Sequence, residues 1–368
     1  MSTTILPSDM NITYQTFIHT EDLSQQRILF RAAFPENVGT SSESEEHYFW
    51  KFQSFPATPF SYEYAAYSDK ELVGYYAAIP YSYRIDGQLT ACGMVCDVMT
   101  HPKKQGKGIF TGIGRYATDD LHKNGVGFTT GYPIRPEVIP GHLKVGWKIV
   151  FNLPMYIKLL RSNSVLKSKK IGFAAPLVNV GLFIANNTFR LLNRKNRDYT
   201  YVVHTRNEFL ELEEYKTFFE KWKLQQQNIL IKTKEFLAWR TGAPQTEYKF
   251  VVIRKDRDVA GIAITRFVEL KEIPSIAVLD LMILNEDKNG LSALYSALVD
   301  IADRYNAEAI ITMMSKRWAQ NYNLKRMGFL KSPFEFSLII KKLDPSMDDA
   351  ALFDESKWHL MWIDSDDL

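Results

Sequence analysis

The sequence predicts an α/β (α+β) protein built from two related domains. Three observations predict this fold class. The chain has 368 residues, enough for two domains of ordinary size. Helix-like and strand-like segments alternate along it. The order of these segments in the first half recurs in the second half, and an internal repeat indicates duplicated structural units.

The repeat rests on motifs that recur in the same order with a nearly constant offset. Each copy is expected to run helix, hairpin, apolar strand, helix, strand, short helix, strand. The corresponding motifs are Trp50-Lys51 with Trp239-Arg240, the runs from Tyr62 and from Tyr248, Gly74 with Gly261, residues 95–99 with 278–282, and residues 143–147 with 324–329. The predicted organisation is a domain over 12–160, an apolar and basic connecting segment over 161–200, a second domain over 201–345 and a tail over 346–368.

Composition describes an ordinary globular chain. It is 46% apolar and carries 45 Lys+Arg against 42 Asp+Glu, a net charge of +3. This balance gives no reason to expect a nucleic-acid partner. Cys92 and Cys96 lie four residues apart on one predicted strand, so they share a face rather than form a disulfide, which fits a reducing compartment. Residues 1–20 lack the pattern of a signal peptide, and a cytoplasmic location is expected.

Residues 171–185 form an apolar stretch, IGFAAPLVNVGLFIA, with basic residues on both sides. It is too short to span a bilayer. One interpretation is a helix on an anionic membrane surface, which would give peripheral membrane contact. The other is a buried helix between the two domains. Because short apolar runs in soluble chains are usually core, the sequence favours the buried helix.

The segment 94–125 is the most informative part of the chain. An apolar strand over 94–100 is followed by Pro102, by the turn Gln105-Gly106-Lys107-Gly108, and by a helix expected from near Ile109 to Asn124-Gly125. Free backbone N–H groups and the positive end of a helix converge at such a junction. Glycine lets the backbone approach an anion closely and adopt positive φ. A pyrophosphate is the natural ligand.

Three kinds of phosphate-binding loop can be distinguished by spacing. The longer motif that ends in Gly-Lys-Ser/Thr is absent, and the dinucleotide motif lacks its third glycine, because Thr111 stands there. The pattern Gln/Arg-x-x-Gly-x-Gly/Ala matches at Gln105 and Gly108 and departs only at Phe110. In this loop the sequence resembles the GNAT superfamily of acyl-CoA transferases.

The resemblance covers the N-terminal half and implies both fold and cofactor. Each domain would have a mixed, largely antiparallel central sheet flanked by helices, giving two tandem GNAT-like domains. The resemblance implies acetyl-CoA or another acyl-CoA as co-substrate, and no metal. Pantetheine would pair with the backbone of Val98 and Thr100, where two strands splay. The residues implied to bind the coenzyme are Val98, Thr100, Gln105, Gly106, Lys107, Gly108, Ile109 and Phe110.

Catalytic residues are less well defined by the sequence. The family commonly has a tyrosine that protonates the departing thiolate, and His142 stands at that position here. A histidine could also donate a proton, since its ordinary pKa lies near neutrality. Glu137 could orient or deprotonate the amine, and Arg135 could bind an anionic group of the substrate. The sequence slightly favours the simpler interpretation that Arg135 and Glu137 are solvated loop residues.

The second copy lacks the glycine-rich turn. Residues 286–290, Glu-Asp-Lys-Asn-Gly, place two carboxylates where an anion would bind. We therefore expect a degenerate second domain without its own coenzyme. Asp97 is a candidate base on the strand before the loop. Its counterpart Asp280 persists in the degenerate copy, so a shared structural role is at least as well supported.

The tail runs from Trp358 through Trp362 to an acidic end at Leu368. With the Trp-Arg motif of the second half it looks like tandem GNAT proteins found with cell-surface polysaccharide genes. Some tandem members use the terminal carboxylate as base, which makes Leu368 a candidate. A frayed tail strand is the simpler interpretation.

The resulting hypothesis is an N-acyltransferase that acts on the amine of a small acceptor, such as an amino sugar. Two alternatives stay open: a Fem-like aminoacyl transferase, which would not need the coenzyme loop, and a non-catalytic acyl-CoA-binding protein. The sequence defines neither the acceptor, the acyl length nor the oligomeric state.

Overall fold

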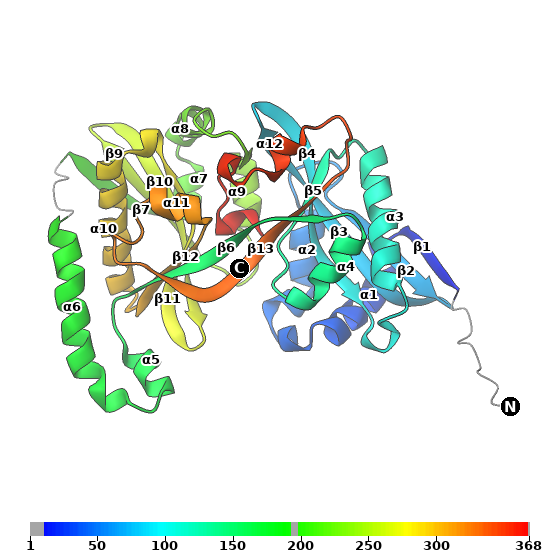
Figure 1. The fold of residues 1–368 in the computed structure, drawn as a ribbon, viewed down its shortest axis with the longest axis horizontal. Coiled ribbons are helices and arrows are strands. Elements are labelled where there is room, and N and C mark those ends of the chain that lie inside the picture. Colours follow the sequence, from blue (N-terminus) through cyan, green and yellow to red (C-terminus); the bar gives the residue numbers. More distant parts are fainter. Residues whose placement is uncertain (1–10, 193–197, 367–368) are drawn as a thin grey trace. The chain divides into compact units, whose positions relative to one another are not determined.

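The computed structural model describes residues 11–192 and 198–366 and divides the chain into two compact units. The first unit comprises the chain up to Tyr81, Thr90–Lys148 and Ile339–Met347. The second comprises Ser82–Leu89, Ile149–Leu338 and the chain from Asp348 (Figure 1). The expected fold class, a mixed α+β protein with two tandem domains, is confirmed.

The first unit is built on a mixed sheet. Its strands lie in the order β1-β2-β3-β4-β5 and then the end of β13. β4 and β5 are parallel, whereas β1 with β2, β2 with β3, and β5 with β13 are antiparallel. The strands are β1 (Ile12–Thr16), β2 (Tyr62–Ser68), β3 (Glu71–Ile85), β4 (Gln88–Thr100), β5 (Phe128–Gly131) and β13 (Leu330–Lys342).

Four α-helices accompany this sheet. They are α1 (His19–Ala33), α2 (Glu45–Gln53), α3 (Ile109–Lys123) and α4 (Ile139–Lys144), with short 3₁₀ helices η1 (Pro35–Asn37), η2 (Ser41–Glu43), η3 (Pro102–Lys104) and η4 (Pro136–Val138). The buried side chains of α3 recur every four residues, at Ile109, Ile113, Ala117 and Leu121, so they form one face. That face packs against apolar residues of β2, β3 and β4.

The second unit repeats the arrangement. Its strands follow the order β13-β6-β12-β11-β10-β9-β7, and β11 with β12 is the parallel pair. The short β8 pairs with Tyr83 and Arg84 at the end of β3. The strands are β6 (Lys148–Leu159), β7 (Tyr199–Thr205), β8 (Ile229–Leu230), β9 (Tyr248–Lys255), β10 (Asp258–Leu270), β11 (Ile273–Ile283) and β12 (Ala309–Met313).

The helices of the second unit include the long α10, which packs on its sheet. They are α5 (Asn163–Ser168), α6 (Ala175–Leu192), α7 (Arg206–Leu210), α8 (Glu214–Lys223), α9 (Lys234–Arg240), α10 (Lys288–Arg304), α11 (Lys316–Asn321) and α12 (Asp349–Phe353). Four 3₁₀ helices complete the unit: η5 (Gly172–Ala174), η6 (Leu284–Glu286), η7 (Glu355–Lys357) and η8 (Trp362–Asp364).

The predicted repeat is visible in the hairpins. In each unit the register shifts just before the repeated glycine, at Gly74 in β3 and at Gly261 in β10. A Cβ on Gly74 would lie 2.8 Å from Ile109 Cγ2, and one on Gly261 would lie 2.6 Å from Ile283 Cδ1. Both positions require glycine because another chain segment approaches the backbone closely.

The last strand of each repeat departs from the expected domain boundaries. β6 follows α4 in the sequence but pairs with β12 in the second unit. β13 follows α11, and its residues Ile339–Lys342 pair with β5 in the first unit. A sequence repeat gives the order of the elements, whereas strand pairing depends on contacts between residues far apart in the chain. The motifs therefore could not predict that the last strand of each repeat pairs in the sheet of the other unit.

The expectation that residues 171–185 form a buried helix is wrong. They lie in η5 and α6, where Phe173 is 87% exposed, Leu177 80% and Phe183 68%. None of the described helices is long and apolar enough to cross a lipid bilayer.

The tail is part of the second unit's core rather than a frayed strand. Trp358 is buried, and its indole donates a hydrogen bond to the Leu352 carbonyl at 2.9 Å. Asp364 lies 2.9 Å from the Lys232 ammonium, which also pairs with Asp280 of β11 at 2.8 Å. All three charged side chains are at most 1% exposed. Leu368 lies outside the described residues.

We predict that Lys232→Ala lowers the free energy of unfolding by about 3–5 kcal/mol, because it leaves two carboxylates buried without their shared cation. Denaturant unfolding of the full chain measures this. Lys216→Ala, at an exposed position on α8, is the control and should stay within about 0.5 kcal/mol of wild type. Equal stability of the two variants would show that the triad does not hold the tail.

Candidate active site

The parallel pair of the first unit opens toward the predicted loop. β4 pairs with β5 from Cys92 to Val95, and β5 ends at Gly131. β4 continues to Thr100, so residues 96–100 extend past the last pair. Beyond Val95 the edge of β4 that faced β5 is no longer paired with β5, and an open strand edge offers backbone N–H and C=O groups. This opening is what the expected pairing of pantetheine with Val98 and Thr100 requires.

The side chain of Thr100 gives a second indication of a missing ligand. Its Oγ1 is buried and has no hydrogen-bond partner among the described residues. Burying a hydroxyl without a partner is unfavourable, and such groups are uncommon in folded proteins. A polar ligand group at the end of β4 would satisfy it.

The loop after β4 has the geometry of an anion site. Gly106 and Gly108 have φ of 75° and 79°, values that favour glycine. A Cβ at either position would meet nothing within 4 Å. Gly108 is the N-cap of α3 and has no side chain to accept hydrogen bonds from the first turn. The first backbone N–H groups of α3 thus remain available to an anion.

Basic side chains surround this helix start. Lys103, Lys107 and, less fully, Lys104 are exposed, and the first turn of α3 has no acidic residue. Lys104 lies 3.8 Å from Glu71, a distance at which an exposed pair is weakly bound. Helix dipole and lysines therefore act in the same direction and favour a phosphate group.

In the second unit, residues of the chain itself occupy both corresponding places, the start of the helix and the end of the parallel strand pair. Asp287 caps α10 by accepting a hydrogen bond from the Asn289 backbone N–H at 3.0 Å. β11 and β12 also stop pairing early, at Val278, but the tail lies there. Met361 bridges to Met314, and the His359 ring lies 2.9 Å from the Tyr322 hydroxyl. This geometry supports the expectation of a degenerate second domain.

Phe110 fills the space beside α4. Its ring lies edge-on to the His142 ring, with 5.0 Å between centroids. A Cβ on Gly141 would lie 2.6 Å from Phe110 Cε1, so this glycine makes room for the ring. The departure at Phe110 is thereby explained, because a larger loop residue is matched by a glycine on α4.

His142 does not have the near-neutral pKa expected from the sequence. The ring lies between Phe110 and Trp147, and the residue is 7% exposed. Burial lowers its pKa to about 4. The imidazole is therefore neutral at neutral pH and can donate an N–H hydrogen bond, but it carries no extra proton.

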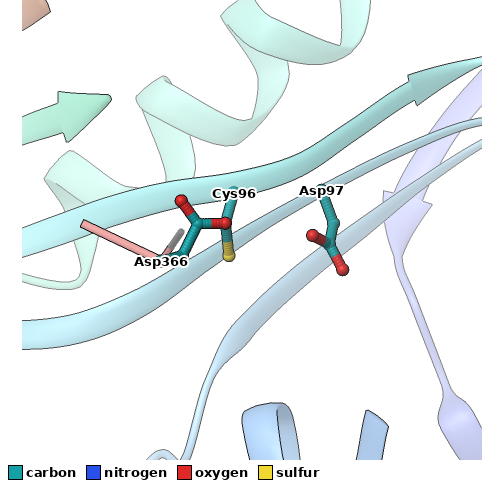
Figure 2. A group of neighbouring side chains, drawn as sticks. All are labelled: Cys96, Asp97 and Asp366. Carbon is teal, nitrogen blue, oxygen red and sulfur yellow. The ribbon is translucent and has the colours of Figure 1, made fainter. Parts of the chain in front are cut away.

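Asp97 adopts a left-handed conformation within β4, with φ of 47°. Figure 2 shows it beside Cys96 on this strand; Asp366, also labelled there, belongs to the second unit. The carboxylate of Asp97 lies 2.8 Å from the Lys51 ammonium of α2. Burial is the largest single influence and raises the pKa of Asp97, but the charge and hydrogen bond of Lys51, together with the charges of Arg27 and His47, hold this pKa below its usual range. An ionised, paired carboxylate is a weak proton acceptor.

The repeat counterpart of Asp97 is also paired with a lysine. Asp280 lies 2.8 Å from Lys232, although Lys51 and Lys232 do not correspond in the repeat. Charge neutralisation at this strand position is thus common to both domains. This agrees with a shared structural role, which the sequence already allowed.

A buried carboxylate in β2 was missed by the sequence analysis. Glu63 accepts hydrogen bonds from the hydroxyls of Tyr48 and Tyr75, each at 2.6 Å. Gln53 and Ser61 bind its other oxygen. Burial raises the pKa of Glu63 despite these donors. The only sequence signal was one carboxylate inside the aromatic strand Tyr62–Ser68.

Arg135 contacts the C-terminal end of α1 and the residues after it, so it is not simply a solvated loop residue. Its guanidinium donates to the Ala33 carbonyl at 3.1 Å, pairs with Glu36 and lies over the Phe34 ring. Glu137 is exposed in η4. The structure therefore assigns Arg135 to the packing of α1, while Glu137 is accessible.

The two cysteines are unsuited to nucleophilic catalysis. Both are free and buried on β4. Burial raises the pKa of the Cys92 thiol to about 12, so the thiolate needed for attack is scarce at neutral pH.

The splayed sheet and the glycine-rich helix start together have the geometry that an acyl-coenzyme A site requires. Residues 17–150 match the family model described as acetyltransferase (GNAT) domain. This part of the chain is a GNAT domain, and by it the chain is an acyl-CoA-dependent N-acyltransferase of the GNAT type. A comparison with curated proteins found no match.

Solved structures show the same fold over most of the chain. A probable N-acyltransferase from Enterococcus faecalis has a TM-score of 0.64 at 11% identity, covering 91% of this chain and 73% of its own. A GCN5-related N-acetyltransferase from Anabaena variabilis has a TM-score of 0.62 at 11% identity, covering 90% and 73%. The Saccharomyces cerevisiae N-myristoyltransferase with bound myristoyl-CoA has 0.59 at 12%, covering 93% and 81%.

The buried His142 gives a testable dependence of stability on pH. Its pKa is lower in the folded than in the unfolded chain, so the unfolded chain binds more protons between pH 6.5 and about 4. The free energy of unfolding should therefore fall by about 3 kcal/mol as the pH falls through this window, at about 1.36 kcal/mol per pKa unit. Urea unfolding measures this.

His142→Phe should remove that part of the pH dependence while keeping the ring contacts. His122→Phe, at an exposed position on α3, is the control and should leave the profile unchanged. An unchanged profile in His142→Phe would contradict the lowered pKa.

Proposed function

We propose that the protein transfers an acetyl group from acetyl-CoA to the primary amine of a small acceptor, with an amino sugar as the acceptor class. The observation that carries this proposal is the uncapped start of α3 beside the opened edge of β4. The acceptor class rests on the sequence resemblance to tandem GNAT proteins found with cell-surface polysaccharide genes.

The chain's own residues suit each part of the coenzyme. The pyrophosphate would accept hydrogen bonds from the amides between Gly106 and Phe110, with Lys107 and Gln105 beside it. Pantetheine would extend along residues 98–100 by backbone hydrogen bonds. The thioester carbonyl would then lie at the opening between β4 and β5.

Transfer would proceed by direct attack of the neutral amine on the thioester carbonyl. The C–N bond forms as the C–S bond breaks, the amine loses one proton, and the thiolate takes one. No covalent enzyme intermediate is proposed, because both cysteines are buried and the Cys92 thiol has a raised pKa.

Three residues are proposed to assist, with roles limited by their environments. Glu137 is exposed and accessible, and it would accept the amine proton directly or through water. Asp97, ionised beside Lys51, would orient the amine rather than deprotonate it. Neutral His142 would donate an N–H hydrogen bond that stabilises the departing thiolate.

The coenzyme site can be tested by thermal stability. Acetyl-CoA should raise the melting temperature of the wild type by several degrees at saturating concentration, since a ligand at 100 times its Kd stabilises by about 2.7 kcal/mol. Gly108→Asp should abolish the shift, because it places a carboxylate where the pyrophosphate binds.

Gly125→Asp is a matched control at the other end of α3. Gly125 has φ of 80° and open space around its Cβ, so this variant bears similar backbone strain and the same added charge. It should keep the shift. Absence of a shift in the wild type with any acyl-CoA would refute the proposed function.

The repeat supplies a control for Asp97. Asp97→Asn should lower kcat/KM for the amine at least tenfold and leave the acetyl-CoA shift intact, because the residue is proposed to act on the acceptor. Asp280→Asn removes the corresponding charge from the second domain and should change kcat/KM less than about twofold per folded molecule. Steady-state kinetics over an amine panel measures both.

Equal activity of the two variants would remove Asp97 from the site. Coenzyme binding without turnover of any amine would favour the non-catalytic alternative. Transfer from charged tRNA without a coenzyme shift would favour the Fem-like one.

A further inference from the structure

Helix α6 has its polar and apolar faces reversed relative to an ordinary surface helix. Residues toward the domain include Asn179 and Asn186. Asn179 Oδ1 accepts hydrogen bonds from the Ser162 backbone N–H and hydroxyl, each at 2.8 Å, and Asn186 donates to the Leu159 carbonyl at 3.0 Å. These bonds fix α6 to the end of β6 through polar contacts.

The outward face is apolar. Leu177 and Ile184, seven residues apart on one helix face, are 80% and 60% exposed, and Val180 beside them is 57% exposed at the edge of the cavity toward α10. Phe183 on its flank is 68% exposed, and Phe173 in the preceding η5 is 87% exposed. A surface helix normally presents such side chains to the core, so this face lacks its partner.

Packing against the rest of the unit does not compensate for this exposure. Between α6 and α10 lies a cavity of about 530 Å³, lined in part by Val180, Phe183 and Tyr295. Figure 1 shows the two helices side by side in the second unit. The helix is thus held at its inner face by hydrogen bonds rather than by a filled apolar interface.

Exposed apolar residues are concentrated here rather than spread over the surface. Of the 23 large apolar side chains that are exposed among the described residues, seven lie between Ile171 and Ile184. Singly scattered apolar residues need no partner, whereas a contiguous set this large indicates a binding surface.

The charge of the same segment is one-sided. Residues 161–197 contain eight Lys+Arg and no Asp or Glu. Taking these eight from the chain's 45 Lys+Arg leaves 37 against 42 Asp+Glu, a net charge of −5 for the remainder. Lys167, Lys169 and Lys170 are exposed directly before η5. The positive net charge of the chain therefore belongs to this segment.

We propose that the outer face of η5 and α6, together with Lys167, Lys169 and Lys170, is a docking surface for an anionic lipid bilayer. Phe173, Leu177 and Ile184 enter the interface between headgroups and acyl chains, with the helix parallel to the membrane plane. The lysines bind the anionic headgroups. Charge decides between a bilayer and a second copy of this chain, because two copies of this surface would bring Lys167, Lys169 and Lys170 of each copy together, and residues 161–197 contain no acidic residue to offset them.

Sedimentation of the full chain with vesicles tests the docking surface. The wild type should bind vesicles of 70% phosphatidylcholine and 30% phosphatidylglycerol. It should bind vesicles of phosphatidylcholine alone at least tenfold less tightly. Raising the salt from 0.1 to 0.5 M should weaken binding to the anionic vesicles, since screening shortens the reach of the lysines.

Two variants separate the apolar and basic contributions. Leu177→Ser with Ile184→Ser should weaken binding to anionic vesicles at least tenfold. Lys167→Glu with Lys169→Glu and Lys170→Glu should weaken it similarly and remove the salt dependence. Matched controls are Leu224→Ser, at a leucine that is 69% exposed after α8, and Lys216→Glu with Lys221→Glu on α8; both should bind like wild type.

Circular dichroism and the acetyl-CoA melting shift establish that each variant is folded, and this readout does not depend on lipid. The proposal would be overturned if the wild type did not bind anionic vesicles. It would also be overturned if the α6 variant bound them as tightly as the wild type. If the wild type is a dimer and the double variant Leu177→Ser with Ile184→Ser is a monomer, the surface serves self-association. That result would also overturn the membrane proposal. None of these outcomes bears on acyl transfer, which is tested separately at Gly108.

Discussion

The pairing of β4 with β5 stops at Val95, and the candidate active site depends on that interruption. Two strands that stayed paired to Thr100 would satisfy each other's backbone groups and leave no room for a ligand. Because β5 ends at Gly131, β4 continues beyond Val95 without β5 as its partner. The same region holds the buried, unpartnered hydroxyl of Thr100 and leads into the uncapped start of α3. A coenzyme that offers both an amide-rich arm and a pyrophosphate would satisfy all three.

The second unit shows the same architecture with the corresponding region occupied by residues of the chain itself. Its parallel pair stops at Val278, the position that corresponds to Val95. The carboxylate of Asp287 caps the helix, and the tail from Trp358 to Asp364 is buried against β11 and its neighbours. The tail adds an anion, Asp364, so the unit also contains Lys232 as a shared cation. The tail packs into this region, which explains why its aromatic side chains Trp358 and Trp362 are buried.

Helix α6 differs from the other helices of its unit, because asparagine side chains on its inner face bind the backbone and a hydroxyl group of the residues at the end of β6. An arrangement of this kind leaves apolar residues facing outward. The basic residues before it give that outward face a preference for negative charge. An enzyme held at a bilayer in this way would meet acceptors at the membrane surface, a consequence that joins the docking proposal to the choice of amine.

The sequence by itself determined the features that depend on neighbouring residues. Positive φ at Gly106 and Gly108, the limits of α3 and the repeated glycines at 74 and 261 follow from local sterics, caps and periodicity, and the structure has them all. Tertiary structure alone decided the exchange of β6 and β13, the burial of the tail, the outward face of α6 and the lowered pKa of His142. Each of these depends on which distant segments meet. Periodicity shows that a face is apolar but not what covers it, and a residue's ordinary pKa says nothing of the rings around it.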